Sequence, residues 1–235
     1  MPRKPVGIVV AMPREVGPLL LGRRAVAVDG LKVFELESAV IAAGGIGRAA
    51  ARRAADTILR RYSPSVLISA GIAGALTDAL HVGDVVCARD VVDASSGARF
   101  AAGGCDETVA TVSAVSGATE KRELALKWRA DVVDMEASAV AAAAQEAGIE
   151  FVAIKSISDE PGFEMPPVGG FVDDAGQFET LRFAVWLAVR PQVWGPVRQL
   201  NANTRIAALK LSDALRHLID QRSKVVSEGK SVRAL

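Results

Sequence analysis

Uninterrupted apolar runs recur along the chain, separated by alanine-rich amphipathic stretches and short glycine-rich breaks. Apolar runs of about four to eight residues are typical of strands that are buried on both faces of a sheet. We therefore predict buried strands at Val6–Ala11, Ser38–Ala43, Ser65–Ala70 and Ile149–Ile157, and shorter strands at Asp84–Ala88 and Asp90–Asp93. These segments are numerous enough to form a central sheet.

Turn residues indicate how two further segments are connected. Asp29 and Gly30 separate Ala25–Val28 from Lys32–Leu36, and Asp-Gly favours the tight turn of a β-hairpin. The segment Ala94–Gly117 is rich in small residues and has no clear period. We expect a loop there with one short strand.

Helical periodicity and helix-end residues predict the remaining elements. We expect helices at Arg14–Leu21, Arg48–Tyr62, Thr119–Trp128, Asp134–Glu146, Phe178–Val189 and Val197–Arg222. Pro13 suits the first turn of a helix, and Gly148 suits a C-terminal cap. The segment Glu160–Gln177 is rich in Pro, Gly and Asp, which predicts a long loop of the kind that often forms a lid.

Strands and helices mix throughout the sequence, without internal repeats or a separate linker. This order predicts an α/β fold, a three-layer α/β/α sandwich around a central mixed β-sheet. We expect one domain over residues 1–222, followed by a frayed tail at 223–235. A chain of 235 residues is long enough to bury a substantial core.

Composition narrows the functional classes. The formal net charge is +1, which gives no electrostatic reason to expect a nucleic acid as partner. Cys87 and Cys105 are too few for a disulfide framework. No signal peptide is evident and no apolar run approaches the ~20 residues that span a bilayer. We therefore expect a cytoplasmic protein without a transmembrane segment.

Metal and covalent chemistry have little support in the sequence. His81 and His217 are the only histidines and lie far apart in the chain. The sequence contains no CxxC, HExxH or nucleophile-elbow motif. We expect no metal and no cofactor.

Acidic residues mark both ends of one apolar helix–strand unit. Asp134 and Glu136 lie at the start of an alanine-rich helix, and Ser158 and Asp159 follow a buried strand. Ionised carboxylates accept hydrogen bonds from adjacent hydroxyl groups, and a protonated carboxyl can protonate a leaving group. The combination favours cleavage of a bond between a sugar and a base.

Two glycine-rich segments follow apolar strands, Gly44–Arg48 and Gly71–Gly74. We predict a turn at each. Glycine there permits a close approach of the backbone to a ligand, although plain turn chemistry explains each segment equally well. Neither matches a dinucleotide-binding motif or a P-loop. Their position at the carboxyl ends of strands is where open α/β sheets bind ligands.

Four blocks of sequence resemble the purine nucleoside phosphorylase and nucleosidase superfamily. They are GIVVAMPREV at Gly7–Val16, AAGGIGRAA at Ala42–Ala50, SAGIAGAL with VGDVV at Ser69–Val86, and VVDMEASAVA with FVAIKSISDE at Val132–Glu160. They cover most of the first 160 residues in the order the family has. The layout is most similar to methylthioadenosine/S-adenosylhomocysteine nucleosidases.

The resemblance implies roles for particular residues. Met135 and Glu136 match the Met-Glu pair that binds the ribose. Asp159 matches the general acid at N7 of the purine, and Ser158 matches the residue that orients it. Glu15 matches the glutamate that activates the nucleophilic water. Asp159 must carry a proton when it acts, and we expect partial burial to favour its neutral form, whereas Glu15 must be ionised.

Further pocket residues follow from the same resemblance. Met12 and Ile46 match apolar residues near the sugar, although methionines such as Met12 and Met135 fill cores equally well. Gly71 and Ile72 lie where phosphorylases bind phosphate, usually with a serine at the position of Ile72. Isoleucine has no hydrogen-bond donor, so we expect water rather than phosphate as co-substrate.

The expected reaction is hydrolysis of a 5′-substituted adenosine-type purine nucleoside, with release of adenine. The chain departs from the family pattern at two places, which keeps alternatives open. One is Ile72. The other is the segment Val112–Ala118, which lacks the aromatic residue that stacks on the purine in the family; Phe163 or Phe171 are the candidate replacements.

With these departures the chain also resembles a subgroup of hopanoid-associated phosphorylases. That resemblance implies adenosylhopane as substrate. The apolar run 183–189 would then line the entrance of the binding site, or else form the buried face of a helix. The other alternative is a nucleoside-binding module without activity. The family also implies a homo-oligomer.

Overall fold

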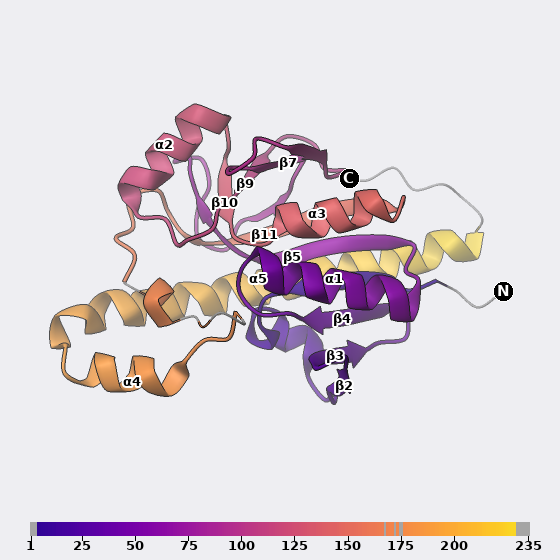
Figure 1. Ribbon diagram of the computed structural model, residues 1–235, viewed down its shortest axis with the longest axis horizontal. Coiled ribbons are helices and arrows are strands. Elements are labelled where there is room, and N and C mark those ends of the chain that lie inside the picture. The colour runs from indigo at the N-terminus through magenta and orange to yellow at the C-terminus, as the bar shows by residue number, and fades with distance from the viewer. Residues whose placement is uncertain (1–3, 167, 172, 174–175, 229–235) are drawn as a thin grey trace.

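A computed structural model describes residues 4–166, 168–171, 173 and 176–228. Its centre is a mixed sheet in which the strands follow the order β2-β3-β4-β1-β5-β10-β9-β7-β8, with β11 paired to β5 and β6 (Figure 1). The strands are β1 (Val6–Val10), β2 (Val26–Val28), β3 (Leu31–Glu35), β4 (Ala39–Ala43), β5 (Val66–Ala75), β6 (Val85–Cys87), β7 (Asp90–Asp93), β8 (Arg99–Ala101), β9 (Thr108–Thr111), β10 (Val132–Asp134) and β11 (Glu150–Asp159).

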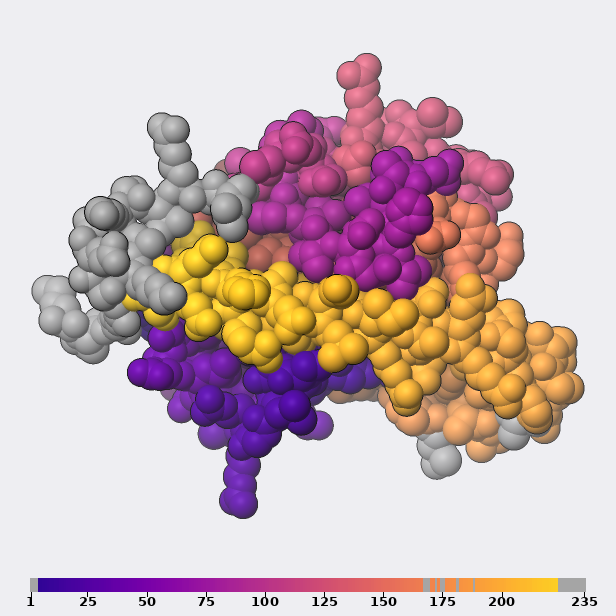
Figure 2. Space-filling model, turned by 180° about the vertical axis from the view of Figure 1, so that it is seen from behind, coloured from indigo at the N-terminus to yellow at the C-terminus, as the bar shows by residue number. Residues whose placement is uncertain are grey.

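Helices cover both faces of this sheet. The α-helices are α1 (Arg48–Tyr62), α2 (Ala118–Trp128), α3 (Ala137–Glu146), α4 (Thr180–Ala188) and α5 (Trp194–Glu228). In Figure 1, α1 and α3 lie on the near face, and Figure 2 shows α5 running across the opposite face. The three-layer α/β/α sandwich predicted from the sequence is confirmed.

Alternate side chains of the central strands pack into two separate cores, because successive residues of a strand point to opposite faces. On one face, Val9 and Leu67 pack with α1 and α3, around Ala54 and Val140. On the other face, a second core joins the sheet to α5; it includes Ile8, Ile68, Ile154, Leu211 and Leu215. Burial on both faces explains why these strands have continuous apolar sequences.

The structure corrects several predicted boundaries. Gly71–Gly74 is not a turn, because it belongs to β5, which continues to Ala75. The sequence before α3 forms strand β10, so the helix begins at Ala137 rather than Asp134. Two short strands, β8 and β9, lie in the segment for which one was expected. In each case, pairing with neighbouring strands overrides the local preference for a turn, helix or loop.

Other corrections concern helices. The predicted helix at Arg14–Leu21 is a 3-10 helix over Pro13–Leu20, interrupted at Val16 and containing Pro18. Proline lacks the N–H that an α-helix needs in its interior.

The long predicted loop contains a short 3-10 helix at Val168–Phe171, and another at Pro191–Val193 precedes α5. Helix α5 includes residues to Glu228, and 229–235 of the predicted tail lie outside the described residues.

One pairing positions the end of β11. This strand runs parallel to β5, with Gly71 opposite Lys155 and Ala73 opposite Ile157, and the register then shifts so that Asp159 lies opposite Gly74. The unpaired residue at the shift is Ser158. A β-bulge redirects the side chains that follow it, and here it sets the direction of Asp159.

The glycine-rich segment after β4 gives a test of the packing. A methyl group at Gly44 would lie 2.7 Å from the carbonyl oxygen of Ala50 and 2.9 Å from Cβ of Ala54. We expect Gly44→Ala to lower the free energy of unfolding by about 1–3 kcal/mol through overpacking, as measured by urea denaturation. Gly17→Ala is the control, since nothing lies within 4 Å of its added Cβ. Equal stability of both variants would contradict the packing.

Candidate active site

A cavity of about 510 Å³ lies where β1, β5, β10 and β11 end. Eight of the nine predicted site residues line it: Met12, Glu15, Ile46, Ile72, Met135, Glu136, Ser158 and Asp159. The ninth, Gly71, lies beside it on β5, where an added Cβ would be 3.7 Å from both Glu15 Oε2 and Lys155 Nζ. Residues from five separate parts of the sequence are thus gathered around one space.

Asp159 is held by a buried lysine. Lys121 Nζ of α2 lies 2.5 Å from Asp159 Oδ2 and donates a second hydrogen bond to the backbone carbonyl of Glu160 at 2.8 Å. Both side chains are almost completely buried, with 1% and 4% of their surfaces exposed. The burial of Asp159, which the sequence led us to expect, is thus accompanied by an ionic partner that the sequence did not indicate.

Two neighbours complete the position of Asp159. The hydroxyl of Ser158 donates to Asp159 Oδ1 at 2.6 Å. A Cβ at Gly74 would lie 2.8 Å from Asp159 Oδ2 and 3.2 Å from Cε of Lys121. Glycine at this position of β5 leaves the room that the ion pair occupies. The second glycine segment thus serves close packing rather than a turn.

Glu15 lies at the start of the 3-10 helix, directly after β1. Its Oε2 accepts hydrogen bonds from the backbone N–H groups of Ala11 at 3.0 Å and Met12 at 3.2 Å. Burial raises the pKa of Glu15, opposed by the Met12 hydrogen bond and the charge of Lys155. A carboxylate with a raised pKa, anchored through one oxygen, is a stronger proton acceptor than an exposed glutamate.

A second buried lysine, Lys155, lies beneath the cavity in the middle of β11. Its Nζ is 2.7 Å from Asp134 Oδ2 and 3.0 Å from the hydroxyl of Ser69. Burial opposes its charge, but Asp134 and Glu136 outweigh burial and raise the pKa of Lys155. The lysine is therefore a permanent positive charge among the acids.

Asp134 is fully occupied by structural contacts. Besides Lys155, its carboxylate accepts hydrogen bonds from the hydroxyl of Thr111 at 2.7 Å and the backbone N–H of Ala137 at 2.8 Å. The last of these contacts satisfies the first N–H of α3. Of the acidic pair at 134 and 136, Glu136 is therefore the one available to a ligand.

Glu136 faces the cavity at the N-terminus of α3. Its Oε1 accepts a hydrogen bond from the backbone N–H of Gly47 at 2.7 Å, in the first glycine-rich segment. Burial and the neighbouring charge of Asp134 raise the pKa of Glu136 to about 7, against the opposing effect of Lys155. The first glycine segment is thus a turn, as predicted, and it presents a backbone donor to this acid.

The site gathers carboxylates. Glu15, Asp134, Glu136 and Asp159 supply four, and the formal charges of Lys121, Lys155, Arg14 and Arg198 balance them when all are ionised. Carboxylates fixed around an enclosed space stabilise a cation that forms there, because low polarity strengthens the attraction. The arrangement is suited to a reaction that develops positive charge on its substrate.

Three arginines differ in their relation to the cavity. Arg48 lies 2.7 Å from Asp93 and also donates to Ser95, so it is engaged in a salt bridge. Arg14 and Arg198 line the cavity, with their guanidinium groups 5.7 Å from the ring centre of Phe178 and 5.9 Å from that of Trp194. The cavity therefore has cationic groups at its wall that the sequence did not indicate.

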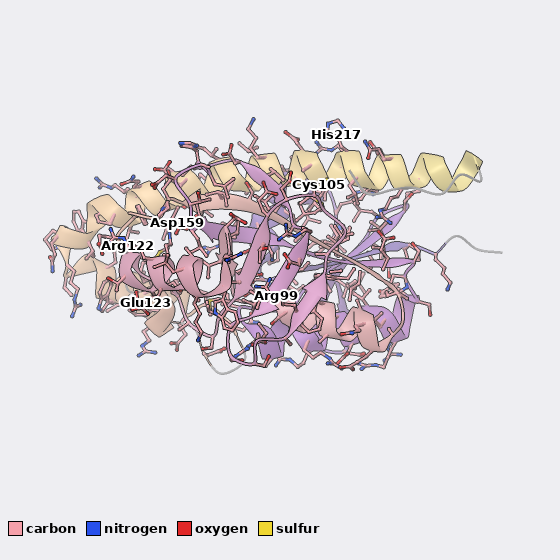
Figure 3. All side chains as sticks on the ribbon, turned by 90° about the horizontal axis from the view of Figure 1, so that it is seen from above. Arg99, Cys105, Arg122, Glu123, Asp159 and His217 are labelled. Carbon is pink, nitrogen blue, oxygen red and sulfur yellow. The ribbon has the colours of Figure 1, made fainter. Side chains whose placement is uncertain are left out.

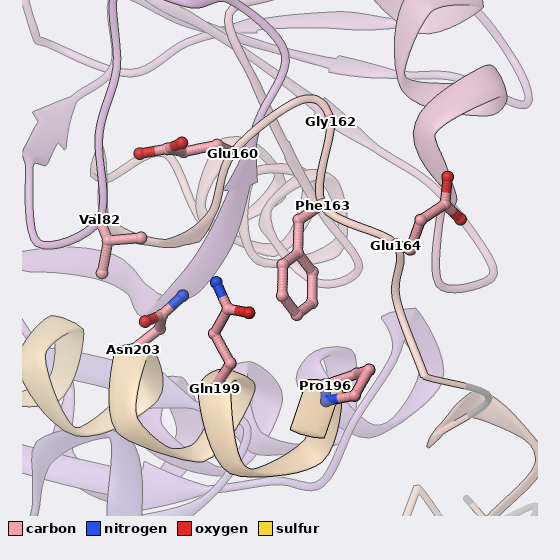
Figure 4. Close-up of a pocket in the computed structure, with 8 residues that line it drawn as sticks. All are labelled: Val82, Glu160, Gly162, Phe163, Glu164, Pro196, Gln199 and Asn203. Carbon is pink, nitrogen blue, oxygen red and sulfur yellow. The ribbon is translucent and has the colours of Figure 1, made fainter. Parts of the chain in front are cut away.

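Aromatic side chains reach the cavity from the C-terminal third of the chain. Phe178 and Phe183 line it. Phe163, one predicted stacking residue, lines a neighbouring cavity of about 590 Å³ together with Glu160, Gln199 and Asn203 (Figure 4). Phe171, the other candidate, packs edge to face against Phe183 at 5.2 Å. Phe178 and Phe183 are thus the aromatic surfaces available to a bound base.

Sequence reasoning missed both lysines. Lys155 had a detectable signal, a single charge inside a buried strand, whereas Lys121 lies in the polar sequence of α2 and has none.

Figure 3 shows Asp159 between α2 and α5, with His217 farther along α5. Among the described residues, no group of three or more Asp, Glu, His or Cys side chains is arranged to hold a metal ion.

Comparisons with known proteins identify the family of the chain. A family model described as the phosphorylase superfamily matches residues 5–109 and 104–180. A 5′-methylthioadenosine/S-adenosylhomocysteine nucleosidase from Actinobacillus succinogenes is 27% identical over 195 residues, which cover 66% of this chain and 85% of the relative. A nucleosidase of the same name from Psychromonas ingrahamii is 27% identical over 67% of this chain and 86% of its own length.

Solved structures share the fold at lower identity. A 5′-methylthioadenosine/S-adenosylhomocysteine nucleosidase from Colwellia psychrerythraea in complex with adenine has a TM-score of 0.69 and 19% identity, and covers 93% of this chain and 96% of its own. The futalosine hydrolase of Helicobacter pylori also has a TM-score of 0.69, with 16% identity and coverage of 93% and 98%. At this identity, the similarity concerns the fold.

The raised pKa of Glu136 predicts a stability effect with a definite sign. The folded state holds this proton up to about pH 7, whereas the unfolded state releases it near the ordinary pKa, so stability from Glu136 is lost as the pH rises through that interval. Glu136→Gln removes the carboxyl group and therefore this loss of stability at higher pH. We expect it to raise the free energy of unfolding at about pH 8 by on the order of 2 kcal/mol, and by much less at about pH 5.

Denaturant unfolding at the two pH values measures the difference. Glu123→Gln, which removes the carboxylate of an exposed glutamate on α2, is the control. A Glu136→Gln variant that is less stable than the parent at the higher pH would refute the assignment of a raised pKa.

Proposed function

We propose that this chain, which belongs to the phosphorylase superfamily and is an enzyme of its purine nucleosidase family, hydrolyses a 5′-substituted adenosine-type nucleoside and releases adenine. The observation that carries the proposal is the gathering of the carboxyl groups of Glu15, Glu136 and Asp159 around one cavity. The names of the curated relatives, which cleave methylthioadenosine and S-adenosylhomocysteine, support the substrate class.

Charge development during the reaction matches this site. When the bond between ribose C1′ and purine N9 breaks, its electron pair moves to the purine and the sugar becomes an oxocarbenium-like cation. Glu136 accepts hydrogen bonds from the ribose hydroxyl groups, and its charge, with that of Glu15, stabilises the cation. Interactions that strengthen as charge develops lower the barrier, rather than only binding the substrate.

Glu15 activates the water. Its Oε2 is anchored by the backbone of Ala11 and Met12, which leaves Oε1 to accept a proton from a water molecule that attacks C1′. The raised pKa of Glu15 makes that transfer easier than for an ordinary glutamate. The oxygen of the water forms the new bond to C1′, and its proton passes to Glu15.

The purine receives its proton from the Lys121–Asp159 pair. The pair holds one transferable proton, which lies on the lysine while Asp159 is ionised. As negative charge accumulates on the purine, one proton moves from Lys121 to Asp159 and from Asp159 to N7, which leaves the lysine neutral until solvent restores its proton. The 2.5 Å contact between the two groups supports this transfer, and Ser158 fixes the orientation of the carboxyl.

Phosphorolysis is the second candidate, and Arg14 and Arg198 are the observation that favours it. Both line the cavity and arginine binds phosphate oxygens well. Hydrolysis remains the proposal because Ile72 provides no hydroxyl at the glycine segment and Arg48 is held by Asp93. A non-catalytic binding module is less consistent with the site, since buried charges are costly and folding alone does not need them.

The proposal predicts base release without phosphate. Purified protein is incubated with adenosine, methylthioadenosine, S-adenosylhomocysteine, futalosine and adenosylhopane, and liberated base is measured by chromatography with and without phosphate. We expect phosphate-independent release from at least one 5′-substituted substrate. Asp159→Asn should reduce turnover by roughly 100-fold or more, while Glu160→Gln, the adjacent carboxyl on the neighbouring cavity (Figure 4), should not. Release that strictly requires phosphate would establish phosphorolysis instead.

A pH profile tests Lys121. In Lys121→Met, Asp159 loses its ionic partner and burial favours its neutral form, so it still delivers a proton in acid but not in alkaline solution. We expect turnover near that of the parent at about pH 5 and a loss of about tenfold or more at about pH 9. Lys121→Arg should restore part of the alkaline activity. A uniform reduction at every pH would show that Lys121 has only a structural role.

A further inference from the structure

Helix α4, the 3-10 turn Pro191–Val193 and the first turns of α5 form an arm, defined here as residues 178–200. Figure 1 shows α4 and the start of α5 as a hairpin that projects beyond the end of the sheet, away from the N-terminus. The same end of α5 protrudes from the body in Figure 2. The arm therefore presents a surface that the sandwich does not cover.

Large apolar side chains are exposed on this arm. Val185 is 63% exposed and Val189 is 72% exposed; they are four residues apart and so lie on the same side of the helix, one turn from each other. Trp194, at the start of α5, is 40% exposed, and its ring N–H is already satisfied by the carbonyl of Leu187 at 2.8 Å. Exposed apolar groups gathered on one element indicate a contact surface.

The charges of the arm are predominantly positive. Arg182, Arg190 and Arg198 lie on it, and its single acidic residue is Glu179, which pairs with Arg182 at 2.5 Å. The guanidinium groups stay beside aromatic rings, with Arg190 4.8 Å from the ring centre of Trp186. Arginine, tryptophan and exposed aliphatic groups close together on one short arm are the composition of segments that bind at the surface of a membrane.

We propose that the arm docks on an anionic lipid surface. Val185, Val189 and Trp194 would enter the boundary between headgroups and acyl chains, and Arg182 and Arg190 would contact lipid phosphates. A second copy of the chain is a poorer occupant. The single acidic residue of the arm, Glu179, is already paired with Arg182, so twofold pairing of this surface would bring two positively charged arms together. In the described part of the chain, no helix is both long and apolar enough to cross a bilayer, so the arm lies on the surface.

Docking there places the cavity beside the lipid. Phe178, Phe183, Val197 and Leu200 of the arm line the cavity wall. An apolar 5′ substituent would therefore extend from the cavity along the arm into the lipid phase. This consequence rests on the proposed function, whereas docking itself does not, so the two are measured separately.

Vesicle sedimentation tests the docking. Protein is mixed with phosphatidylcholine vesicles that contain or lack phosphatidylglycerol, and the bound fraction is measured at low and high salt. We expect binding to the anionic vesicles that weakens with salt. Val185→Asp/Val189→Asp, and separately Arg182→Gln/Arg190→Gln, should each weaken it by about tenfold or more.

The matched control is Val26→Asp/Leu126→Asp, which changes two apolar residues that are 49% and 84% exposed outside the arm. It should bind as the parent does, and thermal unfolding verifies that every variant is folded.

Absence of binding to anionic vesicles, or equal binding by all variants, would overturn the docking proposal. So would light scattering that shows a dimer broken by Val185→Asp/Val189→Asp in a protein that does not bind vesicles, since the arm would then be an interface between copies. Base release from methylthioadenosine without vesicles is measured in parallel. If the parent protein released no base, this result would count against the proposed function and not against docking.

Discussion

The site depends on one buried ion pair, that between Lys155 and Asp134. Carboxylates in a low-polarity interior repel one another and become protonated unless a positive charge is fixed among them. Lys155 supplies that charge from the centre of β11, 2.7 Å from Asp134, and it lowers the pKa values of Glu15 and Glu136 relative to what burial alone would give. Asp134 in turn holds the first turn of α3. Without the charge of Lys155, burial would raise the pKa values of Glu15 and Glu136 further.

The fold and the site could be predicted to different degrees. Continuous apolar runs identified β1, β4 and β11, because strands buried on both faces need apolar residues at every position. Glu136 and Asp159 could be proposed because acids at both ends of an apolar helix–strand unit suit a sugar and a leaving group, and Glu15 because its sequence block resembles the nucleosidase superfamily. The extension of β5 through Gly71–Gly74 could not be predicted, because its cause is pairing with β11 and not local preference. Lys121 had no local signal, since its partner is 38 residues away.

Glycine and the β-bulge connect the fold to the chemistry. The shift in register at Ser158 turns Asp159 toward Gly74, and the missing side chain at Gly74 admits the ammonium group of Lys121. The first glycine segment offers the N–H of Gly47 to Glu136. Backbone features therefore set the positions of both acids. The arm adds a separate element, whose aromatic residues complete the cavity wall.

The central claim is that fixed negative charge in the cavity stabilises a positively charged sugar. Calorimetric affinity for two matched inhibitors tests it most directly: an adenosine analogue whose ribose is replaced by a protonated pyrrolidine, and its uncharged cyclopentane counterpart. The account predicts that the cationic analogue binds at least about 100-fold more tightly, and that Glu136→Gln reduces this preference. Equal affinities for the cationic and neutral analogues would contradict the claim.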